Sequence, residues 1–253
     1  MSIKVYAHRG YSGMYPENTM ASFSAAAEVG CYGIELDVQL TKDGEVVIIH
    51  DETVNRTTDK KGFVRDYTLL ELQNLNASKL HEKMAPDEHI PTFKEYCAFI
   101  KNKNIVTNVE LKTSVYYYEG LEEKTLKIIK EFGLEDRILF SSFNPLSLVK
   151  IQQLIPQVFL ENTYGHISVP CALLDEYPLD NAGALCRQNG YVAFHPGMNL
   201  LNKKHIRDRI QNCHDNGIAV NVWTVNKYSD YKRLEKAGVD GVFTNFCEKY
   251  NNK

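Results

Sequence analysis

Strand-like and helix-like segments alternate along the whole chain of 253 residues, and this alternation limits the possible folds more than any other feature. The expected strands are apolar runs at residues 3–8, 33–38, 106–112, 138–142, 158–162, 191–195, 218–224 and 239–244. The expected helices between them lie at 19–29, 92–101, 121–132, 145–154, 181–188, 204–216 and 228–237. Repeated strand–helix units have parallel strands, and eight of them predict a closed (β/α)₈ barrel, the TIM barrel of the α/β class.

The segment after the second predicted strand breaks the alternation. Asp43-Gly44 stands between two apolar runs, and this dipeptide is a strong signal for a two-residue hairpin loop. The returning strand is therefore antiparallel and lies outside the barrel. Such a loop predicts that Asp37 lies opposite His50 and that Glu35 shares their face of the hairpin.

The residues that follow the hairpin do not fit the alternation either. The stretch from about 52 to 91 is long for a loop, and it has a helical pattern near 69–75. We interpret it as a small insertion after the second barrel strand. Because 43% of the residues are hydrophobic, one large core is possible, and we expect a single domain over residues 1–253.

The charge balance argues against two classes of partner. The chain has 29 Lys and Arg residues and 32 Asp and Glu residues, a net charge of -3, and neither sign forms a block. No basic surface for nucleic acid and no polybasic segment for an anionic membrane is therefore expected. An anionic small molecule would have to be bound at a local site. The oligomeric state stays open.

Targeting signals and cysteine pairs are not recognisable in the sequence. The six cysteines are at least fifteen residues apart, so we expect reduced thiols and no disulfide framework. The first residues lack the pattern of a signal peptide, and no apolar run reaches the length of a transmembrane segment. These observations favour a cytoplasmic location.

Charged side chains gather where the first three barrel strands are predicted to end. Active sites of (β/α)₈ barrels lie at the carboxyl ends of the strands, and side chains two residues apart on a strand point the same way. We therefore expect convergence of seven residues: His8, Arg9, Glu35, Asp37, His50, Glu110 and Lys112.

Three of these residues are carboxylates, Glu35, Asp37 and Glu110, which need positive charge nearby. Crowded carboxylates in poorly solvated space repel one another, and a divalent cation relieves that repulsion. Oxygen ligands favour Mg²⁺ or Ca²⁺ over zinc, and the sequence does not choose between the two. The alternative is a structural network in which the acids pair with Arg9 and Lys112.

The remaining residues of the set suggest the kind of substrate. Arg9 and Lys112 would place two cationic donors beside the metal, which suits a phosphate group. Two histidines suit general acid and general base catalysis near neutral pH. This combination favours cleavage of a phosphodiester.

The order of short motifs along the chain resembles the glycerophosphodiester phosphodiesterase family over nearly the whole sequence. These motifs are His8-Arg9-Gly10, Pro16-Glu17-Asn18-Thr19, Glu35-Leu36-Asp37-Val38, Thr41-Lys42-Asp43-Gly44, His50-Asp51, Arg56-Thr57-Thr58, Pro91-Thr92, Glu110-Leu111-Lys112, Ser142-Phe143 and Trp223-Thr224-Val225. The sequence departs from the family near its end, where Cys247 stands in a place that the family often fills with proline.

The resemblance implies a (β/α)₈ barrel with an insertion, and metal-dependent hydrolysis of glycerophosphodiesters to glycerol 3-phosphate and an alcohol. It implies that His8 and His50 are the catalytic acid–base pair. The metal ligands that it implies are Glu35, Asp37 and Glu110. It further implies phosphate contacts from Arg9 and Lys112 and a glycerol pocket bordered by Trp223.

The role of a few residues stays open at this stage. Glu17 either orients Arg9 or His8, or only begins a helix. His195 is expected to be a structural or rim histidine. The tyrosines at 116–118 either hold a substrate headgroup, contact lipid, pack within the protein or form a dimer interface.

Two alternative functions also stay open. One is a phosphodiesterase of the lysophospholipase D or phosphoinositide type, which would need an acyl groove or an inositol site. The other is a barrel that binds phosphodiesters without cleaving them.

Overall fold

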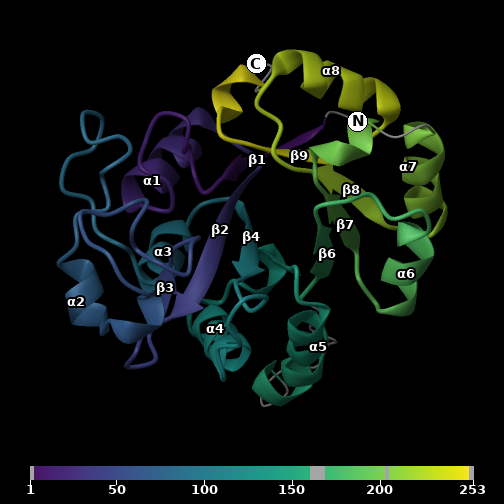
Figure 1. Ribbon diagram of the computed structural model, residues 1–253. Helices are drawn as coiled ribbons and strands as arrows, with labels where there is room; N and C mark the ends of the chain where they lie inside the picture. The colour runs from purple at the N-terminus through teal and green to yellow at the C-terminus, as the bar shows by residue number, and fades with distance from the viewer. Residues whose placement is uncertain (1–2, 160–168, 203–204, 251–253) are drawn as a thin grey trace.

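The computed structural model describes residues 3–159, 169–202 and 205–250, and within them eight parallel strands close into a barrel with helices around it (Figure 1). The barrel closes because β1 pairs with both β9 and β2. This confirms the predicted (β/α)₈ fold. The barrel strands are β1 (Lys4–His8), β2 (Gly33–Leu40), β4 (Val106–Leu111), β5 (Ile138–Ser142), β6 (Cys171–Asp175), β7 (Ala193–Pro196), β8 (Ala219–Val222) and β9 (Gly241–Thr244).

The helices lie outside the strands, and their ends follow local sequence signals. The Thr92 hydroxyl accepts a hydrogen bond from Glu95 N, and the Glu95 carboxylate accepts one from Thr92 N, which is a capping box. Gly133 ends a helix with φ of 65°, a conformation that glycine adopts without strain. The helices that cover the barrel are α1 (Met20–Val29), α3 (Phe93–Ile100), α4 (Leu121–Phe132), α5 (Pro145–Phe159), α6 (Ala182–Gln188), α7 (Ile206–Asp215) and α8 (Tyr228–Ala237).

Short 3₁₀ helices complete the secondary structure. They are η1 (Val64–Asp66), η2 (Glu135–Arg137), η3 (Met198–Asn202) and η4 (Cys247–Lys249). No helix in the described part of the chain is long and apolar enough to span a membrane.

The predicted pairing of Asp37 with His50 is wrong by one residue. The antiparallel strand β3 (Val46–Ile48) pairs Val38 with Ile48, and Ile49 N donates to the Asp37 carbonyl. The loop has three residues instead of two, because Thr41 N donates to Glu45 O and Gly44 adopts a φ of 81°. The register therefore shifts, and His50 lies beyond the end of β3.

The residues after β3 form a small structure of their own beside the barrel (Figure 1). It includes η1 and the short helix α2 (Leu69–Gln73). Its buried apolar side chains form a separate cluster that includes residues of the β3 segment: Val47, Ile49, Val54, Val64, Leu72, Leu75, Ala77 and Ile90. This cluster ties the segment that carries His50 to a packed unit.

The fifth predicted barrel strand, at 158–162, is wrong. Helix α5 continues to Phe159, and residues 160–168 lie outside the described part of the chain. The fifth strand of the barrel is instead β6. The apolar run at 158 fits a helix because Ile151, Ile155 and Val158 are all buried at spacings of four and three residues. Pro156 does not end the helix there. The true strand lacks β-branched residues, so its sequence gave little signal.

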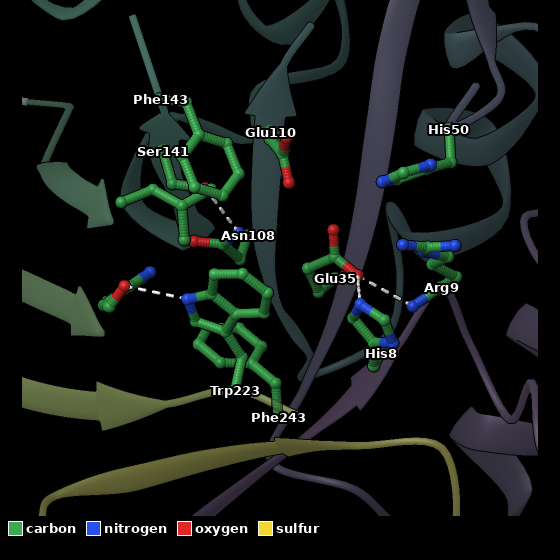
Figure 2. A pocket seen from close by; sticks show the side chains of 12 residues that line it. His8, Arg9, Glu35, His50, Asn108, Glu110, Ser141, Phe143, Trp223 and Phe243 are labelled. Atoms are coloured by element: carbon green, nitrogen blue, oxygen red, sulfur yellow. Dashed lines mark hydrogen bonds and ion pairs between the residues drawn. The ribbon is translucent and has the colours of Figure 1, made fainter. Parts of the chain in front are cut away.

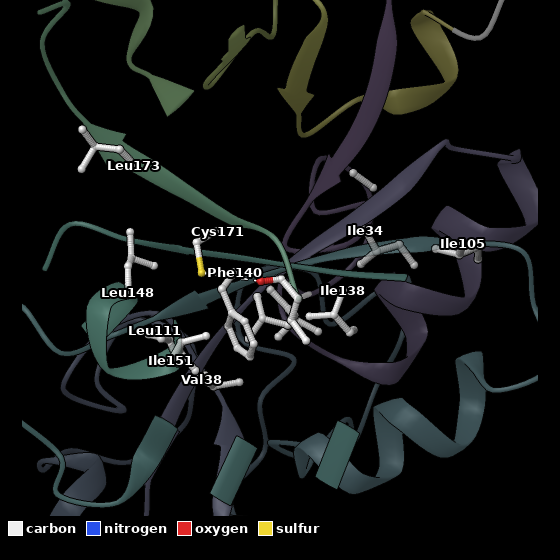
Figure 3. Packing of buried hydrophobic residues seen from close by; sticks show 14 of the residues in the cluster. Ile34, Val38, Ile105, Leu111, Ile138, Phe140, Leu148, Ile151, Cys171 and Leu173 are labelled. Carbon is white, nitrogen blue, oxygen red and sulfur yellow. Dashed lines mark hydrogen bonds between the residues drawn. The ribbon is translucent and has the colours of Figure 1, made fainter. Parts of the chain in front are cut away.

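The main hydrophobic core lies between the outer face of the barrel and the helices. Phe140 on β5 is fully buried, and Leu148 and Ile151 of α5 belong to the same cluster (Figure 3). The inside of the barrel is lined differently. Near the amino ends of the strands it has small side chains such as Ala172 and Ala193. The core therefore stabilises the barrel from outside and leaves room at its mouth.

A polar layer lies inside the barrel, above the small residues. His195 on β7 and Asn221 on β8 are buried and share a hydrogen bond of 3.0 Å between His195 Nε2 and Asn221 Nδ2. The His195 ring also lies against Phe243, with 5.0 Å between ring centroids. Burial lowers the pKa of His195 to about 3, so the ring is neutral in the folded protein at neutral pH.

Replacing Phe140 with Ala should strongly destabilise the protein. The substitution removes a fully buried ring and leaves a cavity, which costs roughly 3–5 kcal/mol of the free energy of unfolding. Urea denaturation measures this loss. Leu146→Ala, at a side chain that is 73% exposed on α5, is the control and should change stability by less than about 0.5 kcal/mol. Equal losses in the two variants would contradict the packing described above.

Replacing His195 with Gln should make stability less sensitive to acid. The pKa of His195 is about 3 in the folded protein and near 6.5 in an unfolded chain, so only the unfolded state takes up this proton between those values. Stability is therefore lost as the pH falls through this window. Between pH 6 and 4 the wild-type slope should exceed that of His195→Gln by about 1.4 kcal/mol per pH unit. Parallel curves from denaturation at several pH values would exclude this contribution.

Candidate active site

A solvent-open pocket of about 370 Å³ lies at the carboxyl ends of the barrel strands (Figure 2). Six of the eight residues expected at the site line it: His8, Arg9, Glu35, His50, Glu110 and Trp223. The other two, Asp37 and Lys112, are buried close to these residues. The lining also includes Asn108, Ser141, Phe143, Leu174, His195 and Phe243, of which only His195 and Phe143 appeared in the sequence argument.

The three predicted carboxylates come together. Glu35 and Asp37 lie two residues apart on β2, and Asp37 is the neighbour of Glu110 in the β2–β4 pairing. One oxygen from each residue lies within 4.8 Å of the others. Asp37 Oδ1 is buried and has no hydrogen-bond partner. These oxygens form a donor set that suits a divalent cation of the Mg²⁺ or Ca²⁺ type.

Electrostatic crowding is visible in the pKa values of these acids. Burial raises the pKa of Glu35, and the charges of Asp37 and Glu110 raise it further. Burial also raises the pKa of Glu110, although the charge of Lys112 opposes this. Asp37 behaves in the opposite way: its pKa is lowered, because the charges of His50, Arg9 and Lys112 outweigh its burial. The cluster therefore carries a negative charge that the protein only partly compensates.

Two cationic side chains supply that partial compensation. Lys112 Nζ lies 2.8 Å from Glu110 Oε1 and 3.9 Å from Asp37 Oδ1. Arg9 Nε lies 3.6 Å from Asp37 Oδ2, and Arg9 N donates to Glu35 Oε2 at 2.8 Å. Both cations thus lie beside the acids without closing the pocket.

The chain turns sharply at the end of β1, which brings Arg9 to the acids. Arg9 has a φ of 56° and Gly10 a φ of 76°, so two successive residues are left-handed. A side chain at position 10 would collide with Ser22, because a Cβ there would lie 2.4 Å from Ser22 Oγ. Glycine is therefore needed at this position for α1 to approach the turn.

Each of the two histidines is held through Nδ1. His8 Nδ1 donates to Asn245 Oδ1 at 2.7 Å, and His8 Nε2 lies 4.0 Å from Glu35 Oε2. His50 Nδ1 donates to Asp51 Oδ1 at 2.7 Å. Figure 2 shows the His8 ring against Glu35, and the His50 ring pointing toward the side of the pocket that carries Glu110. In both rings Nδ1 is therefore occupied, and Nε2 is the nitrogen that remains available.

Burial, together with the smaller effect of the Arg9 charge, lowers the pKa of His8 to about 4. His8 is accordingly neutral at neutral pH in this structure. Its hydrogen bond with Asn245 joins residues that are 237 positions apart in the chain. The ring orientation therefore depends on closure of the barrel, which brings the loop after β9 to the end of β1.

Gln39 positions the His50 backbone, and the sequence argument missed it. Its side chain is buried, and Nε2 donates to the carbonyls of Ile49, His50 and Asp51 at 2.9, 3.1 and 2.8 Å. Tyr118 donates to Gln39 Oε1 at 2.8 Å. The signal that could have identified Gln39 is its place on β2, two residues after Asp37 on the same face.

The remaining residues with open roles now have clear contacts. Glu17 accepts a hydrogen bond of 2.8 Å from Arg9 Nη1, so it orients Arg9. Of the three tyrosines, Tyr118 is buried against Gln39, Tyr117 bonds to Lys150, and Tyr116 stacks on Arg65. Tyr116 and Tyr118 therefore pack within the protein, whereas Tyr117 is 57% exposed.

An aromatic wall forms one side of the pocket. The rings of Phe143 and Trp223 meet edge to face with 5.6 Å between centroids. Trp223 Nε1 donates to the His195 carbonyl at 2.9 Å, which fixes the indole at the mouth (Figure 2). An apolar surface opposite the charged cluster could pack against the carbon chain of a small substrate.

Comparison with known proteins agrees with this geometry. The glycerophosphoryl diester phosphodiesterase family matches residues 8–249. A glycerophosphodiester phosphodiesterase of Caldanaerobacter subterraneus is 42% identical over 253 residues, which cover 100% of this chain and 98% of that protein. One from Bacillus altitudinis is 38% identical over 248 residues, or 97% and 96% of the two chains.

A solved structure also resembles this fold closely. It is that of an Oleispira antarctica phosphodiesterase in complex with sn-glycerol-3-phosphate, with a TM-score of 0.80 and 29% identity over 98% of this chain and 94% of that chain. The family model spans nearly the whole sequence, and the curated relatives match it from end to end. The resemblance found in the sequence is thereby confirmed, and this chain belongs to the glycerophosphoryl diester phosphodiesterase family.

Proposed function

We propose that this glycerophosphodiester phosphodiesterase uses a divalent cation and two histidines to release glycerol 3-phosphate and an alcohol. The observation that carries the proposal is that three converging carboxylates, two cationic side chains and two imidazoles that present Nε2 lie in the pocket or directly beside it. We also propose that the chain acts as one domain, with residues 52–91 as an insertion that supports His50. The family match over residues 8–249 supports this.

Glu35, Asp37 and Glu110 would hold the cation. Among the charged residues in and beside the pocket, five are acids (Glu17, Glu35, Asp37, Asp51, Glu110) and three are arginine or lysine (Arg9, Arg56, Lys112), so the acids outnumber these bases. A divalent cation would offset this excess. Bound there, it would place positive charge beside the phosphate group and favour ionisation of a nearby hydroxyl.

The two histidines would move protons on opposite sides of the phosphate. One Nε2 accepts the proton of the glycerol hydroxyl that attacks phosphorus, and the protonated form of the other ring donates a proton to the departing alcohol oxygen. Water then hydrolyses the resulting cyclic phosphodiester to glycerol 3-phosphate. Asn245 and Asp51 keep Nδ1 occupied, so each ring has only Nε2 available to the substrate.

Arg9 and Lys112 would bind the phosphate oxygens. Both lie beside the acids, where a phosphate bound next to the cation would meet them. Trp223 and Phe143 would pack against the carbon atoms of glycerol. The product complex of the Oleispira antarctica phosphodiesterase supports glycerol 3-phosphate as the small molecule of this site.

Chelation should abolish hydrolysis of glycerophosphocholine, and added Mg²⁺ or Ca²⁺ should restore it. The reason is that the anionic phosphodiester can bind beside the carboxylates only when a cation is bound to them. A second readout does not depend on activity. At a cation concentration of 100 Kd, binding should stabilise the protein by about 2.7 kcal/mol, which thermal denaturation detects. Asp37→Asn should weaken this stabilisation. Glu131→Gln, which changes an exposed ion pair between α3 and α4, should retain it. Full turnover in excess chelator would rule out the metal.

Kinetics should separate the histidines from the phosphate contacts. His8→Ala and His50→Ala should each lower kcat by roughly 10²-fold or more, because proton transfer occurs only in the transition state. Arg9→Ala and Lys112→Ala should raise KM, with a variable loss of kcat, because phosphate is bound in the ground state as well. His205→Ala, at an exposed residue, is the matched control. Near-normal kcat in both histidine variants would refute the proposed acid–base roles.

A further inference from the structure

Arg56 belongs to the segment after β3 and does not line the pocket, yet it makes four hydrogen bonds to two carboxylates beside the pocket. Arg56 Nε and Nη2 donate to Asp51 at 2.8 and 2.9 Å. Arg56 Nη1 and Nη2 donate to Glu17 at 2.6 and 2.8 Å. The planar guanidinium thus forms a bidentate interaction with each carboxylate.

Each of these acids in turn holds a residue of the pocket. Asp51 Oδ1 accepts the Nδ1 proton of His50 at 2.7 Å. Glu17 Oε1 accepts a hydrogen bond from Arg9 Nη1 at 2.8 Å. A continuous chain of charge-assisted bonds therefore runs from His50 through Asp51, Arg56 and Glu17 to Arg9.

The backbone around Arg56 is fixed by its own packing. Val54 and Thr58 are fully buried, and the Thr58 hydroxyl donates to the Val54 carbonyl at 2.8 Å. Thr58 N also donates to that carbonyl, at 3.0 Å, which closes a turn around Arg56. The guanidinium is therefore carried by a rigid turn.

The hydrogen-bond inventory argues against a direct role in substrate binding. An arginine has five N–H donors, and four of them point at Asp51 and Glu17. The same acids also have lowered pKa values. Burial raises the pKa of Asp51, but its hydrogen bonds to His50 and Arg56 outweigh that effect. Burial likewise raises the pKa of Glu17, and its interactions with Arg56 and Arg9 outweigh the burial.

We propose that Arg56 is a positioning residue: it locks Asp51 so that His50 presents Nε2 to the phosphodiester, and it ties this histidine to the phosphate-binding Arg9 through Glu17. The inference rests on the proposed function, in which His50 transfers a proton and Arg9 binds phosphate. Without Arg56, Asp51 can turn toward water, and the His50 ring loses its fixed partner.

Steady-state kinetics with glycerophosphocholine at saturating Mg²⁺ test this role. Arg56→Ala should lower kcat by about 10-fold or more while KM changes by less than about twofold, since supporting bonds of this kind are worth roughly 10- to 100-fold. Arg56→Lys keeps the charge but cannot form both forks, so it should recover only part of the activity. Combining Arg56→Ala with Asp51→Asn should cost less than the sum of the two single losses, because both act through His50.

A matched control separates this effect from a general change of charge. Arg65 lies in the same segment, but its guanidinium stacks on Tyr116, 3.8 Å from the ring centroid. Arg65→Ala should keep wild-type kinetics. A raised KM at unchanged kcat in Arg56→Ala would show that Arg56 binds substrate, and an equal loss in Arg65→Ala would show a general charge effect. Either result, or no change at all, would overturn the proposal.

Proton NMR tests the same proposal without turnover. The Nδ1–H of His50, identified by its loss in His50→Gln, should give a downfield resonance in the wild type and in Arg65→Ala. In Arg56→Ala it should broaden or move upfield. An unchanged resonance in Arg56→Ala, with the fold verified by circular dichroism, would refute positioning. If the wild type fails to hydrolyse glycerophosphodiesters, the proposed function fails, and the NMR result still decides the role of Arg56.

Discussion

The repulsion among Glu35, Asp37 and Glu110 is the constraint on which the rest of the site depends. Buried carboxylates this close can stay ionised only if positive charge is held against them. The fold supplies Arg9 from a left-handed turn and Lys112 from the end of a strand. These cations compensate the acids only in part, which supports our proposal that the site binds a divalent cation and, through it, a phosphate group.

Support for the two histidines comes from barrel strand β2 and from the segments that follow β3 and β9. His8 depends on Asn245, which only barrel closure brings near. His50 depends on Asp51 for its ring and on Gln39 for its backbone. The segment after β3 adds a packed cluster of its own beneath this region. The barrel thus places the acids, and the connecting segments fix the groups that would act on the substrate.

Two local features differ from those predicted from the sequence. The run at Val158 looks like a strand because it is apolar and short, but its buried face continues that of Ile151 and Ile155, so α5 extends through it. In the hairpin, a third loop residue shifts the register by one, and Asp37 pairs with Ile49. His50 still reaches the pocket, because the chain leaves β3 at Ile48 and Gln39 binds the next carbonyls.

The sequence by itself determined the alternation that gives the barrel, and it placed Glu35 and Asp37 on one face, because strand periodicity is a local property. Motif order was enough to indicate the family. Only the tertiary structure decided which side chains meet across the barrel mouth. The link from His50 to Arg9 through Arg56, and the bond from His8 to Asn245, join residues distant in sequence. No local pattern encodes such contacts, because they form only when separate segments pack together.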